Sequence, residues 1–161
     1  MAETITLSGV PETMLQTVYA RAKESRGRGA IRDPKAEEII GRLDYDFSLA
    51  DKDAAMHSGV IARTIVLDQL VGEYLAAHSG ATVMNLACGL DTRCYRMQGY
   101  AHWYNLDLPE TIAVREALLP ESGSISQLAM SALSPAMYLR PSSPVLRLYR
   151  QAQPATKEAG T

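Results

Sequence analysis

A single glycine and a single aspartate, each near the end of a short apolar segment, have the spacing of a ligand site. Gly89 follows the apolar run at residues 81–87, and Asp107 ends the run at 103–107, 18 residues after the glycine. A glycine at the carboxyl end of a parallel strand lets a ligand approach the backbone, because ligands of open parallel sheets bind at that edge. An acid about 20 residues further on is placed to accept hydrogen bonds from both ribose hydroxyls. The pair therefore predicts a site for a ligand that contains a nucleoside.

The turn after the first apolar run distinguishes between classes of nucleoside cofactor. Dinucleotides require the closely spaced glycines of G-x-G-x-x-G to receive a pyrophosphate. Residues 87–92 read ACGLDT, with one glycine and with Asp91 placed where it would repel a phosphate. S-adenosylmethionine has no phosphate, and its cationic sulfonium and amino groups tolerate nearby carboxylates. The turn therefore favours S-adenosylmethionine over NAD, and a nicotinamide-dependent oxidoreductase is the disfavoured alternative.

The charged residues around this turn also have purely structural interpretations. Asp107 could cap a helix that begins near Pro109. Arg93 could form a structural ion pair as readily as it could touch a ligand, and Arg63 could be a solvated charge on a helix. The three histidines are scattered along the chain, and two cysteines are too few for a disulfide framework or a four-thiolate zinc site. No metal site and no catalytic base is predicted.

Hydrophobic periodicity predicts the elements that hold the site. The predicted helices cover residues 11–25, 34–40, 57–77, 93–98 and 109–119. Residues 43–51 are predicted to form a loop. The predicted strands, which are short and apolar, cover residues 81–87, 103–107 and 125–131. This alternation predicts an α/β fold with a parallel sheet and right-handed crossovers.

Composition and charge are those of an ordinary globular domain. The chain has 161 residues, of which 47% are hydrophobic, and a net charge of −2. Such a charge predicts no binding to nucleic acid or to an acidic membrane. No run reaches about 18 apolar residues, and the N-terminal residues lack a signal-peptide pattern, so neither a membrane span nor secretion is expected. With only two cysteines, these features favour the reducing cytoplasm.

At its motifs the sequence resembles the leucine carboxyl methyltransferase superfamily, and within it the bacterial tetracenomycin-type O-methyltransferases of polyketide biosynthesis. The likeness runs from about residue 13 to about residue 133. It is carried by NLACGLDTR at 85–93, WYNLDLPE at 103–110, RAKES at 21–25, ART at 62–64 and Asp33-Pro34. A Gly-Leu-Asp-Thr-Arg turn followed by Asp-Leu-Pro is much more specific than a glycine-rich loop alone.

The resemblance implies a partial Rossmann-like class I methyltransferase fold, in which N-terminal helices precede the first strands of a parallel sheet. It implies S-adenosylmethionine as the cofactor. Asp107 would hold the ribose, and Ala87 and Gly89 would let the backbone approach the methionine part. Arg63, assisted by Lys23, would pair with the cofactor carboxylate, which suits a guanidinium fork. The implied reaction is O-methylation of a carboxyl or hydroxyl group on a small acceptor, polyketide-related by this resemblance.

The resemblance also predicts how the chain is organised. Residues 1–80 would form a helical cap region of the same domain, 81–134 the front half of the cofactor-binding domain, and 135–161 a poorly ordered tail unlike the family. Family members are longer, so a truncation or frameshift after about residue 134 is expected, and the missing half would supply most of the acceptor site. The strand at 81–87 would then have an unpaired edge, which predicts either self-association or marginal stability. The alternative function is an inactive half-domain that binds S-adenosylmethionine weakly or serves only as an interaction module.

Overall fold

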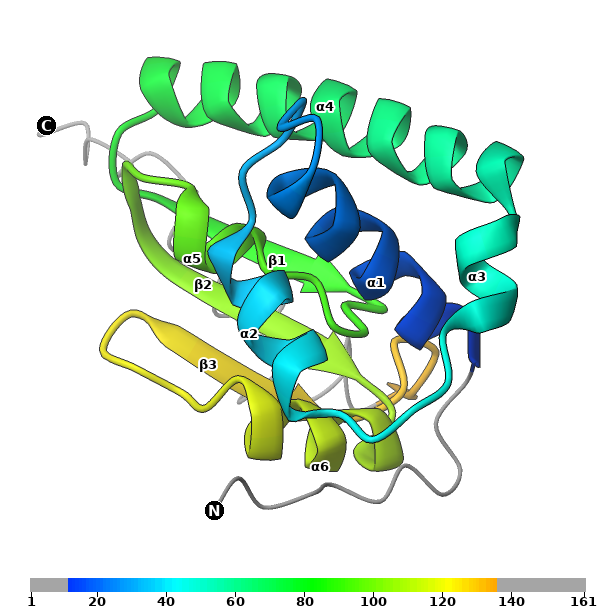
Figure 1. The fold of residues 1–161 in the computed structure, drawn as a ribbon. Coiled ribbons are helices and arrows are strands. Elements are labelled where there is room, and N and C mark those ends of the chain that lie inside the picture. Colours follow the sequence, from blue (N-terminus) through cyan, green and yellow to red (C-terminus); the bar gives the residue numbers. More distant parts are fainter. Residues whose placement is uncertain (1–11, 136–161) are drawn as a thin grey trace, which may run out of the picture.

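The computed structural model describes residues 12–135, which form helices packed on one three-stranded sheet (Figure 1). The first helices are α1 (Glu12–Arg26), α2 (Pro34–Arg42), α3 (Ser48–Lys52) and α4 (Ala54–Ala77). The elements that follow are β1 (Ala81–Leu86), α5 (Arg93–Arg96), β2 (Tyr100–Asp107), α6 (Pro109–Leu118) and β3 (Ile125–Ala129). The predicted tail lies, from residue 136 onward, outside the described residues.

The sheet is parallel and has the order β1-β2-β3, which confirms the predicted α/β fold. Leu86, the last residue of β1, pairs with Leu106, one residue before the end of β2, so the two strands end at nearly the same level. In Figure 1 the arrowheads of both strands point to the side on which α1 begins. The carboxyl ends of β1 and β2 therefore open toward the N-terminal helices, and the turn after β1 lies between sheet and helix.

The three largest differences from the predicted elements are one additional helix and two earlier starts. The supposed loop contains α3, and the segment before it is held by Phe47, whose ring stacks on Tyr19 with centroids 4.5 Å apart. Helix α4 begins earlier than predicted because Asp53 caps it, accepting a hydrogen bond from the Met56 amide at 2.8 Å. Strand β2 begins at Tyr100, whose hydroxyl donates to the Cys94 carbonyl at 2.6 Å. Each difference involves a contact between particular side chains or backbone groups, which hydrophobic periodicity alone does not predict.

Two hydrophobic clusters hold the helices to the sheet. One joins α1, α2, the turn after β1 and the end of α6; its buried members are Met14, Leu15, Val18, Ala22, Ala36, Ile39, Leu90, Leu118 and Leu119. The other lies between α4, α5 and the sheet; its buried members are Leu75, Cys94, Trp103 and Ile125. The turn between β1 and α5 is therefore anchored on both sides by packed apolar residues.

Helical spacing predicts an apolar stripe on α4 at Val60, Thr64, Leu67, Val71 and Tyr74, and this stripe is buried only in part. Val60 and Thr64 are buried, whereas Leu67 and Tyr74 are 38% and 58% exposed. The first half of α4 packs on α1, and the second half contacts the sheet cluster through Leu75, while Leu70 and Tyr74 in the same half remain exposed. No helix in the described part of the chain has the combination of length and apolarity that crossing a membrane requires.

Candidate functional site

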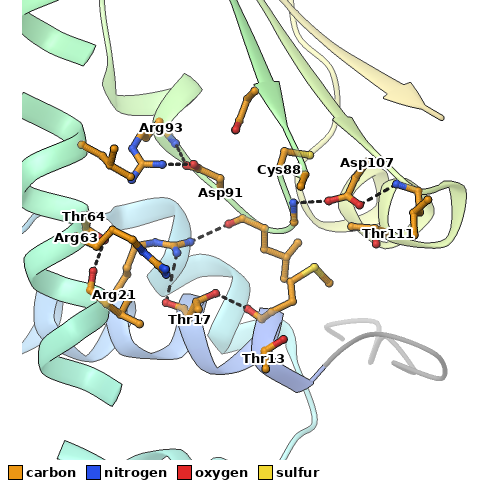
Figure 2. Close-up of a pocket in the computed structure, with 18 residues that line it drawn as sticks. Thr13, Thr17, Arg21, Arg63, Thr64, Cys88, Asp91, Arg93, Asp107 and Thr111 are labelled. Atoms are coloured by element: carbon orange, nitrogen blue, oxygen red, sulfur yellow. Dashed lines mark hydrogen bonds and ion pairs between the residues drawn. The ribbon is translucent and has the colours of Figure 1, made fainter. Parts of the chain in front are cut away.

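A pocket of about 570 Å³ opens where β1 and β2 end, between the sheet and helices α1 and α4 (Figure 2). Its size lies in the range typical of small-molecule sites. Four of the five residues predicted to bind a cofactor line it: Arg63, Ala87, Gly89 and Asp107. The structure therefore brings together residues from α4, from the turn after β1 and from the end of β2.

The carboxylate of Asp107 lies directly against the glycine turn. Its Oδ2 accepts a hydrogen bond from the Gly89 amide at 2.8 Å, and its Oδ1 accepts one from the Leu108 amide at 2.8 Å. The residue that caps α6 is Leu108, so Asp107 does not occupy the capping position of that helix. This contact confirms that the acid and the turn, 18 residues apart in the chain, form one feature.

The turn itself has a backbone that favours small residues. Ala87 has a φ of 51° and Gly89 a φ of 47°, both in the left-handed region. A Cβ added at Gly89 would lie 3.3 Å from the Cγ and Sδ atoms of Met14 on α1. A side chain at this position would therefore be strained and would fill the space through which a ligand approaches the backbone.

A buried arginine that the sequence analysis missed fixes the turn from beneath. Arg115 of α6 is fully buried, and its guanidinium donates to the carbonyl of Gly89 at 2.9 Å and to Oε1 of Gln127 at 2.9 Å. Its third contact is the Cys94 sulfur at 3.6 Å. The signal was present, because Arg115 falls at helical spacing between Ile112 and Leu119 on the buried face of α6.

A second buried charge cluster, also missed, holds the turn from the side of α1. Arg21 donates to the Leu90 carbonyl at 2.8 Å and to Oδ2 of Asp33 at 3.0 Å, and the same oxygen accepts from the Thr92 hydroxyl at 2.6 Å. Burial acts to raise the pKa of Asp33, but Arg21, Thr92 and Arg96 outweigh it, so this pKa lies below its usual value. Asp33 also caps α2, since its Oδ1 accepts a hydrogen bond from the Ala36 amide at 3.0 Å.

Arg93 forms structural ion pairs at the rim of the pocket. Its Nε lies 2.7 Å from Oδ1 of Asp68, and its Nη1 contacts the carboxylate of Asp91. The amide of Arg93 also donates to Asp91 Oδ1 at 2.8 Å. Of the two interpretations that the sequence left open, the structural ion pair is therefore realised, although the side chain still borders the pocket.

The two basic residues predicted for a cofactor carboxylate lie in different places. Arg63 lines the pocket, is exposed, and has no carboxylate within ion-pair distance among residues 12–135. Lys23 pairs with Asp51 and lines a separate hollow together with Glu24 and Asp51. The structure therefore leaves the guanidinium of Arg63 available to a ligand and does not bring Lys23 to this pocket.

The pocket presents a chemically specific set of groups to a ligand. A carboxylate stands beside a tight turn whose backbone is accessible, and on α4 stands the guanidinium of Arg63, which has no ion-pair partner within residues 12–135. No cluster of three metal-ligating side chains occurs within the described ranges. A zwitterionic nucleoside without phosphate matches this set: sugar hydroxyls to Asp107, a carboxylate to Arg63, and cationic groups near acidic side chains.

Comparison with known proteins points in the same direction. The sequence model of the family described as leucine carboxyl methyltransferase matches residues 14–141. The tetracenomycin polyketide synthesis O-methyltransferase TcmP of Streptomyces glaucescens is 42% identical over 137 residues, which cover 81% of this chain and 50% of that protein. The S-adenosyl-L-methionine-dependent methyltransferase dpfgK of Gibberella zeae is 32% identical over 129 residues, which cover 73% of this chain and 43% of that protein.

The chain thus spans about half the length of the curated relatives it matches. The family match includes the turn after β1, Asp107 and the helices α1 and α4 that enclose the pocket. The segment that the family model matches and the sequence identity to TcmP are both large enough to establish family membership. The chain belongs to the leucine carboxyl methyltransferase family.

Proposed function

We propose that the chain binds S-adenosylmethionine in the pocket above the glycine turn and takes part in methyl transfer to an oxygen of a small acceptor. The observation that supports this most strongly is the contact of Asp107 with the Gly89 amide at the mouth of a pocket of suitable volume. The names of the relatives support the choice of cofactor, since dpfgK is called S-adenosyl-L-methionine-dependent.

The residues present fit this cofactor. A carboxylate has about four acceptor positions, so Asp107 can accept from both ribose hydroxyls while it keeps its two amide donors. The open backbone at Ala87 and Gly89 receives the methionine part, and Arg63 takes its carboxylate through a charge-assisted pair. The absence of a phosphate in the ligand avoids repulsion by Asp91 and Asp107.

Bound in this way, the cofactor supplies an activated methyl group, and the protein's task is to hold the acceptor oxygen in line with it. A carboxylate acceptor needs no base because its oxygen is already deprotonated. A hydroxyl acceptor loses one proton, and no residue of the described segment is assigned that role. The acceptor class we propose, a carboxyl or hydroxyl group on a polyketide-related molecule, is supported by the likeness to TcmP.

The setting and assembly belong to the same proposal. A cytoplasmic location is supported by two cysteines, Cys88 and Cys94, that are both free and buried. Self-association through β1 is supported by the position of this strand at the edge of the sheet among the described residues.

Calorimetric titration of the chain with S-adenosylmethionine, S-adenosylhomocysteine and NAD tests the cofactor assignment. We expect the first two to bind and NAD not to bind. Asp107→Ala should weaken binding about tenfold or more, since hydrogen bonds to a charged group contribute about 1.5–3 kcal/mol. Glu110→Ala, an exposed acid on the first turn of α6, is the matched control and should leave affinity unchanged.

A second variant separates binding from folding. Asp107 also fixes the turn, so its loss could act through structure, whereas Arg63 is exposed and has no ion pair within residues 12–135. Arg63→Ala should therefore weaken cofactor binding about tenfold without lowering the melting temperature. Binding of NAD, or equal S-adenosylmethionine affinity in wild type and both site variants, would refute the proposed function.

A further inference from the structure

Within residues 12–135 the helices that pack on the sheet do so on one of its faces. Trp103 of β2 packs with Cys94 of α5 and Leu75 of α4 in one hydrophobic cluster. Gln127 of β3, which the strand register places on the same face, accepts a hydrogen bond from the guanidinium of Arg115 on α6 at 2.9 Å. In Figure 1 helices α2 and α5 lie in front of the strands. Helices α4, α5 and α6 therefore cover one face of this parallel sheet.

The opposite face of the sheet, which we call the open face, is neutral and largely apolar. Because side chains alternate along a strand, it is formed by Thr82, Met84, Leu86, His102, Tyr104, Leu106, Ser126 and Leu128. None of these residues belongs to either hydrophobic cluster of the described segment. His102 contacts two neighbours on this same face, the Ser126 hydroxyl at 2.9 Å and the Tyr104 ring at a centroid distance of 4.3 Å. Parallel sheets are normally covered on both faces, so a cover is expected here.

The burial of Leu106 shows that such a cover exists. Leu106 lies in the middle of the open face, paired with Leu86 on one side and with Leu128 on the other. It is only 1% exposed, whereas Leu86 at the edge is 49% exposed. The hydrophobic clusters formed by the described helices do not include Leu106, so those helices do not account for its burial. The cover is therefore to be sought outside residues 12–135.

The chain beyond residue 135 has both the composition and the length to supply this cover. Residues 136–150 carry seven large apolar or aromatic side chains, namely Met137, Tyr138, Leu139, Val145, Leu146, Leu148 and Tyr149. The run VLRLY at 145–149 lies beyond the segment that the family model matches. Ten residues of extended chain span up to about 33 Å, which exceeds the length of about 26 Å of the eight-residue strand β2. The run can therefore reach any strand of the open face from the end of the described segment.

The first eleven residues of the chain are a poorer candidate for the cover. They lead into α1, which packs with α2, the turn after β1 and α6 in the other hydrophobic cluster. They contain fewer large apolar residues, and these are scattered among polar ones. The C-terminal run is concentrated and follows directly from β3, so it is the better occupant.

We propose that residues 145–149 of the same chain dock on the open face and bury Tyr104 and Leu106 beneath their apolar side chains. The face carries no charge that would repel the arginines of this region, and Arg147 and Arg150 can cover apolar surface with their stems while their guanidinium groups stay in water. The inference goes beyond the proposed function and does not depend on cofactor binding. It assigns a role to the part of the chain that the family model does not match: it closes the second face of the sheet that holds the glycine turn.

Photo-cross-linking of the full chain tests this docking directly. The photoreactive amino acid p-benzoylphenylalanine replaces Tyr104 on the open face, a change that keeps an aromatic ring at this position. The matched control carries it in place of Tyr45, which packs on the helical side of the molecule. An equal mixture of ¹⁵N-labelled and unlabelled protein is irradiated, and the cross-linked peptides are identified by mass spectrometry. The isotope pattern separates cross-links within one chain from cross-links between two copies.

We expect the probe at position 104 to cross-link to residues 145–149 of its own chain, and the probe at position 45 to form no such cross-link. The double substitution Leu146→Asp and Leu148→Asp should abolish the cross-link and lower the urea midpoint of unfolding, because burying either carboxylate against the sheet is unfavourable. Gln151→Asp with Gln153→Asp adds the same charge at polar positions of the same region and should change neither result.

Four results would overturn the proposal: cross-links from position 104 only between two copies, cross-links to the first eleven residues instead, equal cross-linking from positions 104 and 45, or no cross-link to residues 145–149 at all. A cross-link that persists unchanged in the Leu146→Asp, Leu148→Asp protein would overturn it as well, because the docking would then not depend on the apolar side chains.

Discussion

At Arg115 a guanidinium lies fully buried, and its hydrogen-bond partners among residues 12–135 are a backbone carbonyl, an amide oxygen and a thiol rather than a carboxylate. A buried cation without a counter-charge is costly, so these three contacts are what offset the burial of Arg115. Arg115 donates to the backbone carbonyl of Gly89, and Asp107 accepts from the backbone amide of the same residue. Both backbone polar groups of Gly89 are therefore held by side chains. The ligand-facing turn is therefore positioned by side chains from β2 and α6.

We predict that Arg115→Met lowers the free energy of unfolding by about 2–4 kcal/mol, because it removes the donor to the partly buried Gly89 carbonyl and to the buried Gln127 amide oxygen. Urea denaturation measures the change. Arg42→Met is the control, since Arg42 donates to the carbonyls of Ala117 and Leu118 from a partly exposed position. It should lose less than about 1 kcal/mol. Equal losses in the two variants would contradict a special role for Arg115.

At the scale of elements, Asp33 joins α2 to the turn after β1. It caps α2 and pairs with Arg21 of α1, and it accepts the hydroxyl of Thr92 at the start of α5. Its pKa is lowered in the folded protein relative to the unfolded chain. A depressed carboxylate pKa stabilises the fold above the unfolded pKa of about 3.9, and this stabilisation is lost as the pH falls through the folded pKa.

Asp33→Asn keeps a capping residue but removes the charge, so we expect about 3–5 kcal/mol less stability at pH 7. The difference from wild type should shrink as the pH falls below the unfolded pKa of about 3.9 and through the lower folded pKa, because the unfolded chain and then the folded protein take up the proton. Urea unfolding at several pH values measures both effects. Asp46→Asn, an exposed turn residue, should show neither a large loss nor this pH dependence. A constant difference between Asp33→Asn and wild type across the range would disprove the assignment.

Local patterns predicted the elements that form the site, because short apolar runs and turn residues act over a few positions. Because β1 and β2 are parallel and neighbouring, their carboxyl ends lie side by side, and this alone is enough to predict that Asp107 lies near Gly89. The buried charges escaped prediction because their partners are distant in sequence; Thr92 and Asp33 are 59 residues apart. The exposure of Leu67 and Tyr74 escaped for a related reason, since helical periodicity does not reveal how much surface the sheet offers to α4.

For the whole molecule, the two edges of the sheet differ in protection. On β3 the outward amide of Gln127 donates to the side chain of Glu121 at 2.6 Å, which blocks pairing at that point. Strand β1 reads ATVMNL, without charge or proline, and within residues 12–135 no side chain caps its outer edge in this way. Beside it lies an apolar hollow of about 320 Å³, lined by Leu70, Val71, Tyr74, Leu75, Thr82, Val83 and Met84. An uncharged edge next to an apolar hollow is a ready template for a further strand.

A second copy of the chain offers a matching edge, so β1 strands from two molecules should pair and cover each other's exposed Leu70 and Tyr74. We predict that sedimentation velocity shows a dimer whose population rises with protein concentration. Thr82→Lys places a charge on the edge strand and should shift the equilibrium to monomer, as lysine does on natural edge strands. Ala113→Lys adds the same charge on the exposed side of α6 and should leave the dimer intact. A monomer at all concentrations, or equal dissociation by both lysines, would show that β1 does not mediate association.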